Sequence, residues 1–123
     1  MAFLNYSNSK KSIFKSSHSL EKRKNEFIRI NKKFKNQIPV IIDIESENIS
    51  IDIKKYLVLD GLILSEFFSI LRKQLHINSN KSVLLFCDNI ILHMAVPMSS
   101  LYNDHKDEDG FLYINIREES MFG

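Results

Sequence analysis

The residue pattern changes abruptly at Ile38, and this change constrains the fold more than any other feature. Residues 1–37 are polar and rich in lysine and serine, with apolar residues at helical spacing, whereas β-branched runs dominate from Ile38 onward. Helices repeat every 3.6 residues and strands every two, so the two parts must fold differently. We therefore expect an N-terminal helical subdomain over residues 1–37, with residues 1–9 mobile, followed by a strand-rich domain over residues 38–123.

The first part predicts two helices. An apolar stripe at helical spacing is formed by Leu20, Phe27, Ile30 and Phe34. Basic residues occupy the other positions, which is typical of an amphipathic helix packed on a globular body. A shorter helix around residues 10–17 would be anchored by Ile13 and Phe14.

The second part predicts an ordered series of strands and helices. We expect strands over residues 38–44, 49–59, 82–87 and 111–116, and helices over residues 64–76 and 98–105. The first two strands would form a hairpin, and the longer helix would return the chain as a third strand parallel to the first. This order predicts an α+β fold, a ubiquitin-like β-grasp with a four-stranded mixed sheet and a crossing helix, preceded by two N-terminal helices. The last strand would be central, and residues 117–123 would form a free tail.

Composition excludes several classes of protein. A chain of 123 residues with 44% hydrophobic and 26% charged residues is typical of one soluble domain. The lone Cys87 cannot form an internal disulfide and suits a reducing compartment. No apolar run approaches the roughly 18 residues of a membrane span, and the N-terminus lacks a secretory signal. We expect a cytoplasmic protein.

The terminal glycine suggests a function. Gly123 carries a carboxylate without a neighbouring Cβ, so its acyl carbon can enter a narrow enzyme channel and accept a nucleophile. That chemistry suits a protein which is itself transferred onto another molecule. A glycine at this position by chance is the alternative, because glycine is common in all proteins.

Several blocks of sequence resemble one known family. They are Glu21-Lys22-Arg23, Ile38-Pro39-Val40-Ile41, Lys54-Lys55-Tyr56-Leu57-Val58, Phe67 with Arg72-Lys73, Met98 with Leu101-Tyr102, Lys106 to Tyr113, and Glu119-Ser120-Met121-Phe122-Gly123. In this order and spacing, from about His18 to Gly123, the chain resembles the autophagy-related ubiquitin-like modifiers of the GABARAP and light-chain type.

The resemblance implies a modifier without enzymatic activity of its own. In the family a protease exposes the terminal glycine, an activating enzyme takes it up as a thioester, and a conjugating enzyme passes it to the amine of phosphatidylethanolamine. Gly123, preceded by Phe122, would be the conjugated residue. Two acyl chains would then hold a soluble domain firmly on the autophagosomal membrane.

The resemblance also implies a groove that docks short aromatic-x-x-aliphatic peptides of cargo receptors and adaptors by strand addition. The first pocket would be lined by Glu26, Ile30, Pro39, Ile41, Lys55, Leu57 and Phe111. The second would be lined by Tyr56, Val58, Leu59, Leu62, Phe67, Ile70 and Leu71. Lys54 and Lys55 suit the acidic residues that such peptides carry. We expect no cofactor and a monomer in solution.

The chain departs from the family pattern at several positions. Gln37, Ile53 and Gln74 stand where basic residues are common, and Leu59 stands where a proline is usual. The first three departures affect the charged part of peptide recognition, and Leu59 changes the second pocket.

Other candidate sites are less well supported. Cys87 near His93 could suggest a nucleophile with a base, but the cysteine lies in an apolar run where a thiolate is disfavoured. The segment from His105 imitates a calcium loop and lacks its acidic ligands at the first and last positions. We interpret Asp107, Glu108 and Asp109 as a solvated acidic turn, and the histidines lack metal-ligand spacing.

Two alternative functions stay open at this point. One is a divergent relative that binds peptides and is never conjugated. The other is a small basic RNA-binding domain, although the lysine-rich first third lacks an aromatic platform for stacking bases, and we expect no specific nucleic acid partner.

Overall fold

The computed structural model describes residues 13–119. The predictions for residues 1–9, for Phe122 and for Gly123 lie outside this range. The elements are α2 (Ile13–Ser17), α3 (Leu20–Lys33), β1 (Gln37–Ile44), β2 (Ile49–Ile51), β3 (Lys55–Leu59), α4 (Leu64–Arg72), β4 (Leu75–Ile77), β5 (Val83–Cys87), β6 (Ile90–Ile91), α5 (Met98–His105) and β7 (Leu112–Glu118).

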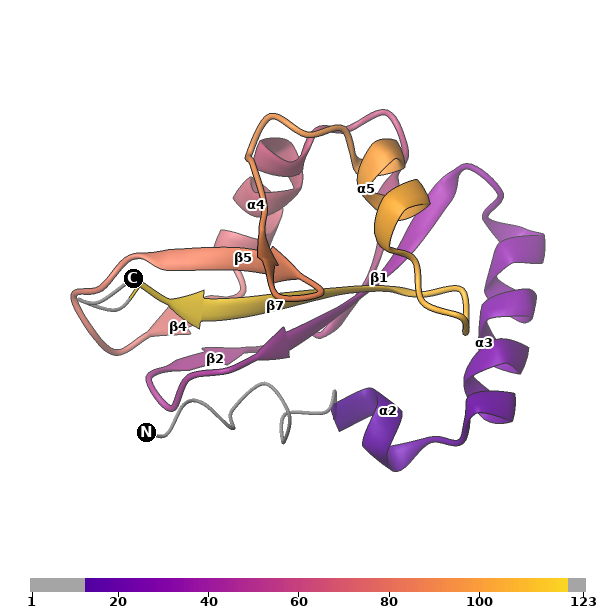
Figure 1. Cartoon of the computed structure of the whole chain (residues 1–123), viewed down its shortest axis with the longest axis horizontal. Helices are drawn as coiled ribbons and strands as arrows, with labels where there is room; N and C mark the ends of the chain where they lie inside the picture. The colour runs from indigo at the N-terminus through magenta and orange to yellow at the C-terminus, as the bar shows by residue number, and fades with distance from the viewer. Residues whose placement is uncertain (1–12, 120–123) are drawn as a thin grey trace.

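The main sheet has the strand order β3-β1-β7-β5-β6. Strand β7 lies between β1, to which it is parallel, and β5, to which it is antiparallel. This arrangement confirms the predicted grasp-type mixed sheet with a central last strand, to which the short β6 adds a further edge (Figure 1). The expectation that the third strand runs parallel to the first was wrong, because β7 takes that position.

Three predicted boundaries were also wrong. Residues 49–59 do not form one strand, because β2 leaves the main sheet and pairs with β4, while β3 alone pairs with β1. The helix predicted over residues 64–76 ends at Arg72, since residues 75–77 form β4. The predicted free tail begins too early, because Arg117 and Glu118 belong to β7.

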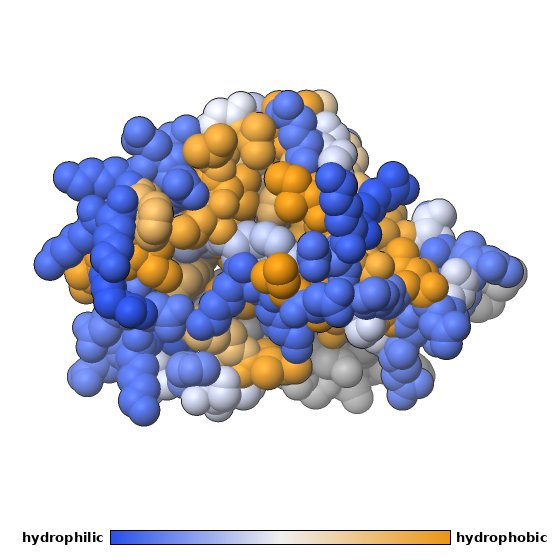
Figure 2. Space-filling view, turned by 180° about the vertical axis from the view of Figure 1, so that it is seen from behind, coloured by the Kyte–Doolittle hydropathy of each residue, from blue (hydrophilic) through white to orange (hydrophobic). Residues whose placement is uncertain are grey.

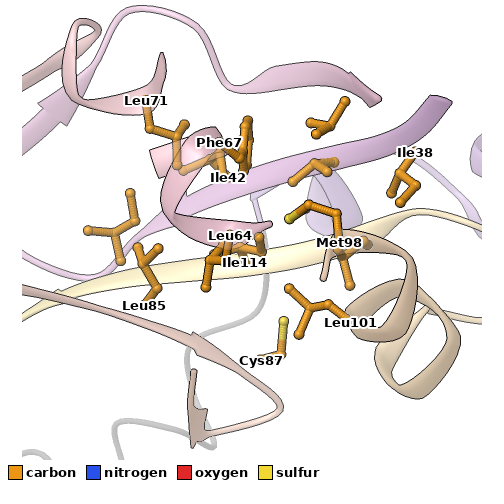
Figure 3. Packing of buried hydrophobic residues seen from close by; sticks show 14 of the residues in the cluster. Ile38, Ile42, Leu64, Phe67, Leu71, Leu85, Cys87, Met98, Leu101 and Ile114 are labelled. Carbon is orange, nitrogen blue, oxygen red and sulfur yellow. The ribbon is translucent and has the colours of Figure 1, made fainter. Parts of the chain in front are cut away.

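Alternation along the central strands builds a core on each face of the sheet. Ile42 and Ile114 point toward α4 and α5, where they pack with Leu64, Phe67 and other buried apolar residues (Figure 3). Ile41, one position from Ile42, and Phe111, three positions from Ile114, point to the opposite face and pack with Phe14 of α2. The N-terminal helices therefore have a core of their own on the sheet.

Local signals explain where α3 lies. The Ser19 side chain accepts a hydrogen bond from the N–H of Lys22, and Glu21 in the first turn and Lys32 and Lys33 in the last turn complement the helix dipole. In Figure 2, where α3 lies at the left, hydrophilic residues gather over it. No helix within residues 13–119 combines the length and apolar character that a membrane crossing requires.

Candidate functional site

Strand β3 forms one edge of the main sheet. Its burial alternates, so that Lys55, Leu57 and Leu59 are exposed while Val58 is buried in the core. Leu57 and Leu59 keep 38% and 57% of their surface in water, which is high for leucine in a strand. An edge strand with exposed apolar side chains can accept another extended chain.

The residues predicted for the first pocket converge from α3, β1, β3 and the position just before β7. The Lys55 ammonium lies 3.0 Å from a carboxylate oxygen of Glu26 and joins β3 to α3. Ile41 and Phe111 form one buried cluster, against which Ile30 packs. Pro39 is buried on β1 opposite Leu57, so Leu57 and Lys55 are the exposed apolar and basic residues that β3 adds to this set.

The residues predicted for the second pocket are divided between core and surface. Val58, Phe67 and Leu71 are core residues, and Tyr56 and Leu62 pack against that core. The rings of Tyr56 and Phe67 meet edge to face at 5.4 Å between centroids. Ile70 on α4 is exposed, whereas the strand alternation places Leu59 on the same face as Leu57 and Lys55.

A buried carboxylate was missed by the sequence analysis. Asp109 was interpreted as part of a solvated turn, but its side chain has no exposed surface. It accepts hydrogen bonds from Arg23 Nη1 at 2.7 Å, from the Tyr113 hydroxyl at 2.5 Å and from the N–H of Phe111 at 2.8 Å. The signal in the sequence was Arg23 itself, which occupies a position on the apolar stripe of α3 between Leu20 and Phe27.

This network anchors the N-terminal helices to the loop before β7. Lys15 of α2 forms an ion pair with Asp107, and Arg23 lies 3.8 Å from the same residue. Burial alone would raise the pKa of Asp107, but the hydrogen bonds from Lys15 and from the N–H of Asp109 lower it. Burial and the hydrogen bond to Asp109 raise the pKa of Tyr113. Both groups thus keep their usual charge state near neutral pH.

The surroundings of Cys87 do not favour a nucleophilic role. The thiol is buried and donates to the carbonyl of Tyr113 at 3.2 Å. Burial, with a smaller contribution from Asp88, raises its pKa to about 12, so almost no nucleophilic thiolate exists at neutral pH.

The end of β7 is hydrogen-bonded to the β1–β2 loop and to the β4–β5 loop. Glu118 accepts hydrogen bonds from the hydroxyls of Ser46 and Ser79 and from the amide of Asn48. The N–H of Glu119 donates to the carbonyl of Ser82 at 2.8 Å. The chain therefore leaves the sheet from a fixed position.

Comparison with known proteins places these features in one group. Residues 22–123 match the family model described as autophagy protein Atg8, ubiquitin-like. Proteins named Autophagy-related protein 8 from Cochliobolus heterostrophus and Neurospora crassa are each 44% identical to the chain over 115 residues. The matches cover 92% of this chain and 97% and 95% of those relatives.

Solved structures show the same fold. The crystal structure of Trypanosoma brucei ATG8 superposes with a TM-score of 0.78 at 29% identity and covers 93% of this chain and all of that one. Plasmodium falciparum Atg8, solved in complex with a Plasmodium falciparum Atg3 peptide, has a TM-score of 0.78 at 31% identity. That match covers 89% of this chain and 98% of the other.

Proposed function

The chain belongs to the Atg8 family of ubiquitin-like autophagy proteins, and from this premise we propose that Gly123 is conjugated to phosphatidylethanolamine and that the β3 edge docks short peptides. The modifier has no enzymatic activity of its own. It acts in autophagosome formation and recruits cargo receptors and adaptors to that membrane, and it is cytoplasmic before conjugation.

Conjugation joins the carboxyl carbon of Gly123 to the ethanolamine nitrogen. An activating enzyme first adenylates the carboxylate with ATP, which releases pyrophosphate, and its thiol then displaces AMP to form a thioester. The acyl group passes to the thiol of a conjugating enzyme, and the amine displaces that thiol to form the amide. Glu118 and Glu119 support this role, because their hydrogen bonds to the two loops fix the point where the terminal segment begins. A protease of the same pathway exposes or releases the glycine.

The conjugating enzyme is also a docking partner. A peptide of Atg3 is bound in the Plasmodium falciparum Atg8 structure, to which this chain is similar. By this similarity the chain engages its own conjugating enzyme through a short peptide.

The docking proposal rests on one observation. Leu57 and Lys55 are exposed on β3, which is an edge strand of the sheet. A peptide added along β3 pairs its backbone with the strand and places an aromatic residue toward Lys55 and an aliphatic residue toward Ile70. Lys54 and Lys55 attract acidic residues of the peptide. An interface of this size gives affinities in the micromolar range.

Membrane flotation tests the conjugated role against that of an adaptor which is never conjugated. Lysates of autophagy-competent cells expressing the chain are floated through a density gradient. We expect a fraction of the wild-type chain and of the Ser120→Ala control to float with membranes, and Gly123→Ala to stay in the soluble fractions. Equal flotation of Gly123→Ala would contradict conjugation, and absence of flotation in all three chains would favour the unconjugated adaptor.

A further inference from the structure

The floor of the first pocket is already covered in this structure. Ile41 and Phe111 each retain only 2% of their surface, although both would have to contact the aromatic residue of a docked peptide. Phe27, Ile30 and Tyr113 pack on this cluster, and α2 adds Phe14, whose ring meets that of Phe111 edge to face at 5.4 Å between centroids. The chain thus places an aromatic side chain of its own on the surface that a peptide aromatic would use.

Lys55 of the first pocket also contacts Phe14. The Lys55 ammonium lies 4.6 Å from the centre of the Phe14 ring while it pairs with Glu26. A cation over an aromatic face is attracted to it, so Lys55 stabilises the Phe14 ring in this position. The same ammonium would be needed by an acidic residue of a peptide.

The helix that carries Phe14 depends on tertiary contacts. Helix α2 has five residues, too few to be stable alone in water. Phe14 is its buried residue, and Lys15 connects it to Asp107. Because α2 depends on these contacts, we expect it to detach more readily than α3, which keeps Arg23 paired with Asp109.

We propose that Phe14 is an internal competitor for the first pocket, so that a peptide binds only after α2 has moved and Phe14 has left Ile41 and Phe111. This inference rests on the proposed docking function. Peptides with an acidic residue next to the aromatic one are the favoured class, because their carboxylate draws Lys55 away from the Phe14 ring and from Glu26. The measured affinity is lowered by the fraction of chains in which the pocket is open.

Binding of one labelled peptide to variants of the full chain tests this inference. The peptide has an aromatic-x-x-aliphatic core with acidic residues before it, and dissociation constants are measured by fluorescence anisotropy. We expect Phe14→Ala to bind about tenfold more tightly, as when a pocket open in about a tenth of chains becomes fully open. Ile13→Ala, which changes a residue of the same helix that is 64% exposed, is the matched control and should bind like the wild type.

A second variant separates competition from loss of structure. Lys15→Ala keeps the Phe14 ring and removes the tie to Asp107, so it should also bind more tightly, by about threefold. Unchanged or weaker binding by both Phe14→Ala and Lys15→Ala, with wild-type binding intact and both variants folded by circular dichroism, would overturn the competitor role and leave docking itself standing. Absence of binding in every variant, the wild type included, would overturn both proposals.

Discussion

Arg23 and Asp109 lie 86 residues apart in the sequence, yet the guanidinium donates to the carboxylate at 2.7 Å, and the aspartate side chain is sealed from water. The pair connects α3 to the loop that leads into β7. It also orients the Tyr113 hydroxyl and the N–H of Phe111, so the floor of the first pocket depends on it.

Arg23→Ala should destabilise the chain strongly. The substitution leaves a buried carboxylate without its cation, which costs about 3 kcal/mol in comparable sites. Urea denaturation measures the loss, and Lys22→Ala on the exposed side of α3 is the control, expected to change the free energy of unfolding by less than about 0.5 kcal/mol. A loss below about 1 kcal/mol for Arg23→Ala would show that water reaches Asp109.

Gly110→Ala should be about as damaging, for steric reasons. Gly110 has φ of +98°, and a Cβ built on it would lie 2.4 Å from the Phe27 ring. We expect a loss of about 2–4 kcal/mol from strain and overpacking. In the double variant Phe27→Ala/Gly110→Ala the clash with the ring is absent, but the backbone strain remains. The stability losses of the two single variants should therefore not add. Simple additivity in thermal or urea melts would contradict the contact.

Leu57→Asp should abolish peptide binding without unfolding the protein. Because Leu57 is exposed, a charge there costs little stability, but it places a carboxylate where the peptide aromatic would lie. The dissociation constant should rise at least about tenfold. Ile90→Asp, an exposed residue on the far edge strand β6, is the matched control and should bind peptide normally. Equal losses in both variants would argue against docking along β3.

Glu118 should make stability depend on acid pH. Hydrogen bonds from Ser46, Ser79 and Asn48 lower its pKa to about 2, from an ordinary value of 4.5. The folded pKa lies below the unfolded one, so this stabilisation is fully present above pH 4.5 and is lost as the pH falls toward about 2. Urea melts between about pH 5 and pH 3 should therefore decline less steeply for Glu118→Gln than for the wild type. Identical slopes would mean that the three donors do not hold the carboxylate.

The sequence predicted the central elements because their patterns are long and regular. The stripe of α3, the continuous apolar run of β1 and the alternation of β7 extend over several turns or pleats, and the structure confirms all three elements. The short segment Leu75–Ile77 fits both helical and extended periods, and its pairing with β2 joins residues far apart in sequence. Its assignment to the end of α4 was wrong for that reason.

Burial of polar residues was the harder part to predict. An acidic run such as residues 107–109 is usually solvated, and only a partner elsewhere in the chain reveals that one member is buried. The pocket residues were named from the resemblance, which cannot show that Phe14 covers Ile41 and Phe111, because that contact depends on where α2 packs.

Intact-mass and fragmentation mass spectrometry after a reconstituted reaction tests whether Gly123 is conjugated. The chain is incubated with activating and conjugating enzymes of the pathway, ATP and vesicles containing phosphatidylethanolamine. We expect the product to gain the mass of one phosphatidylethanolamine less one water, the fragments to place this added mass on Gly123, and Gly123→Ala to gain nothing. An unmodified wild-type chain, in a reaction that conjugates a known family member, or a lipid found on any other residue, would contradict this expectation.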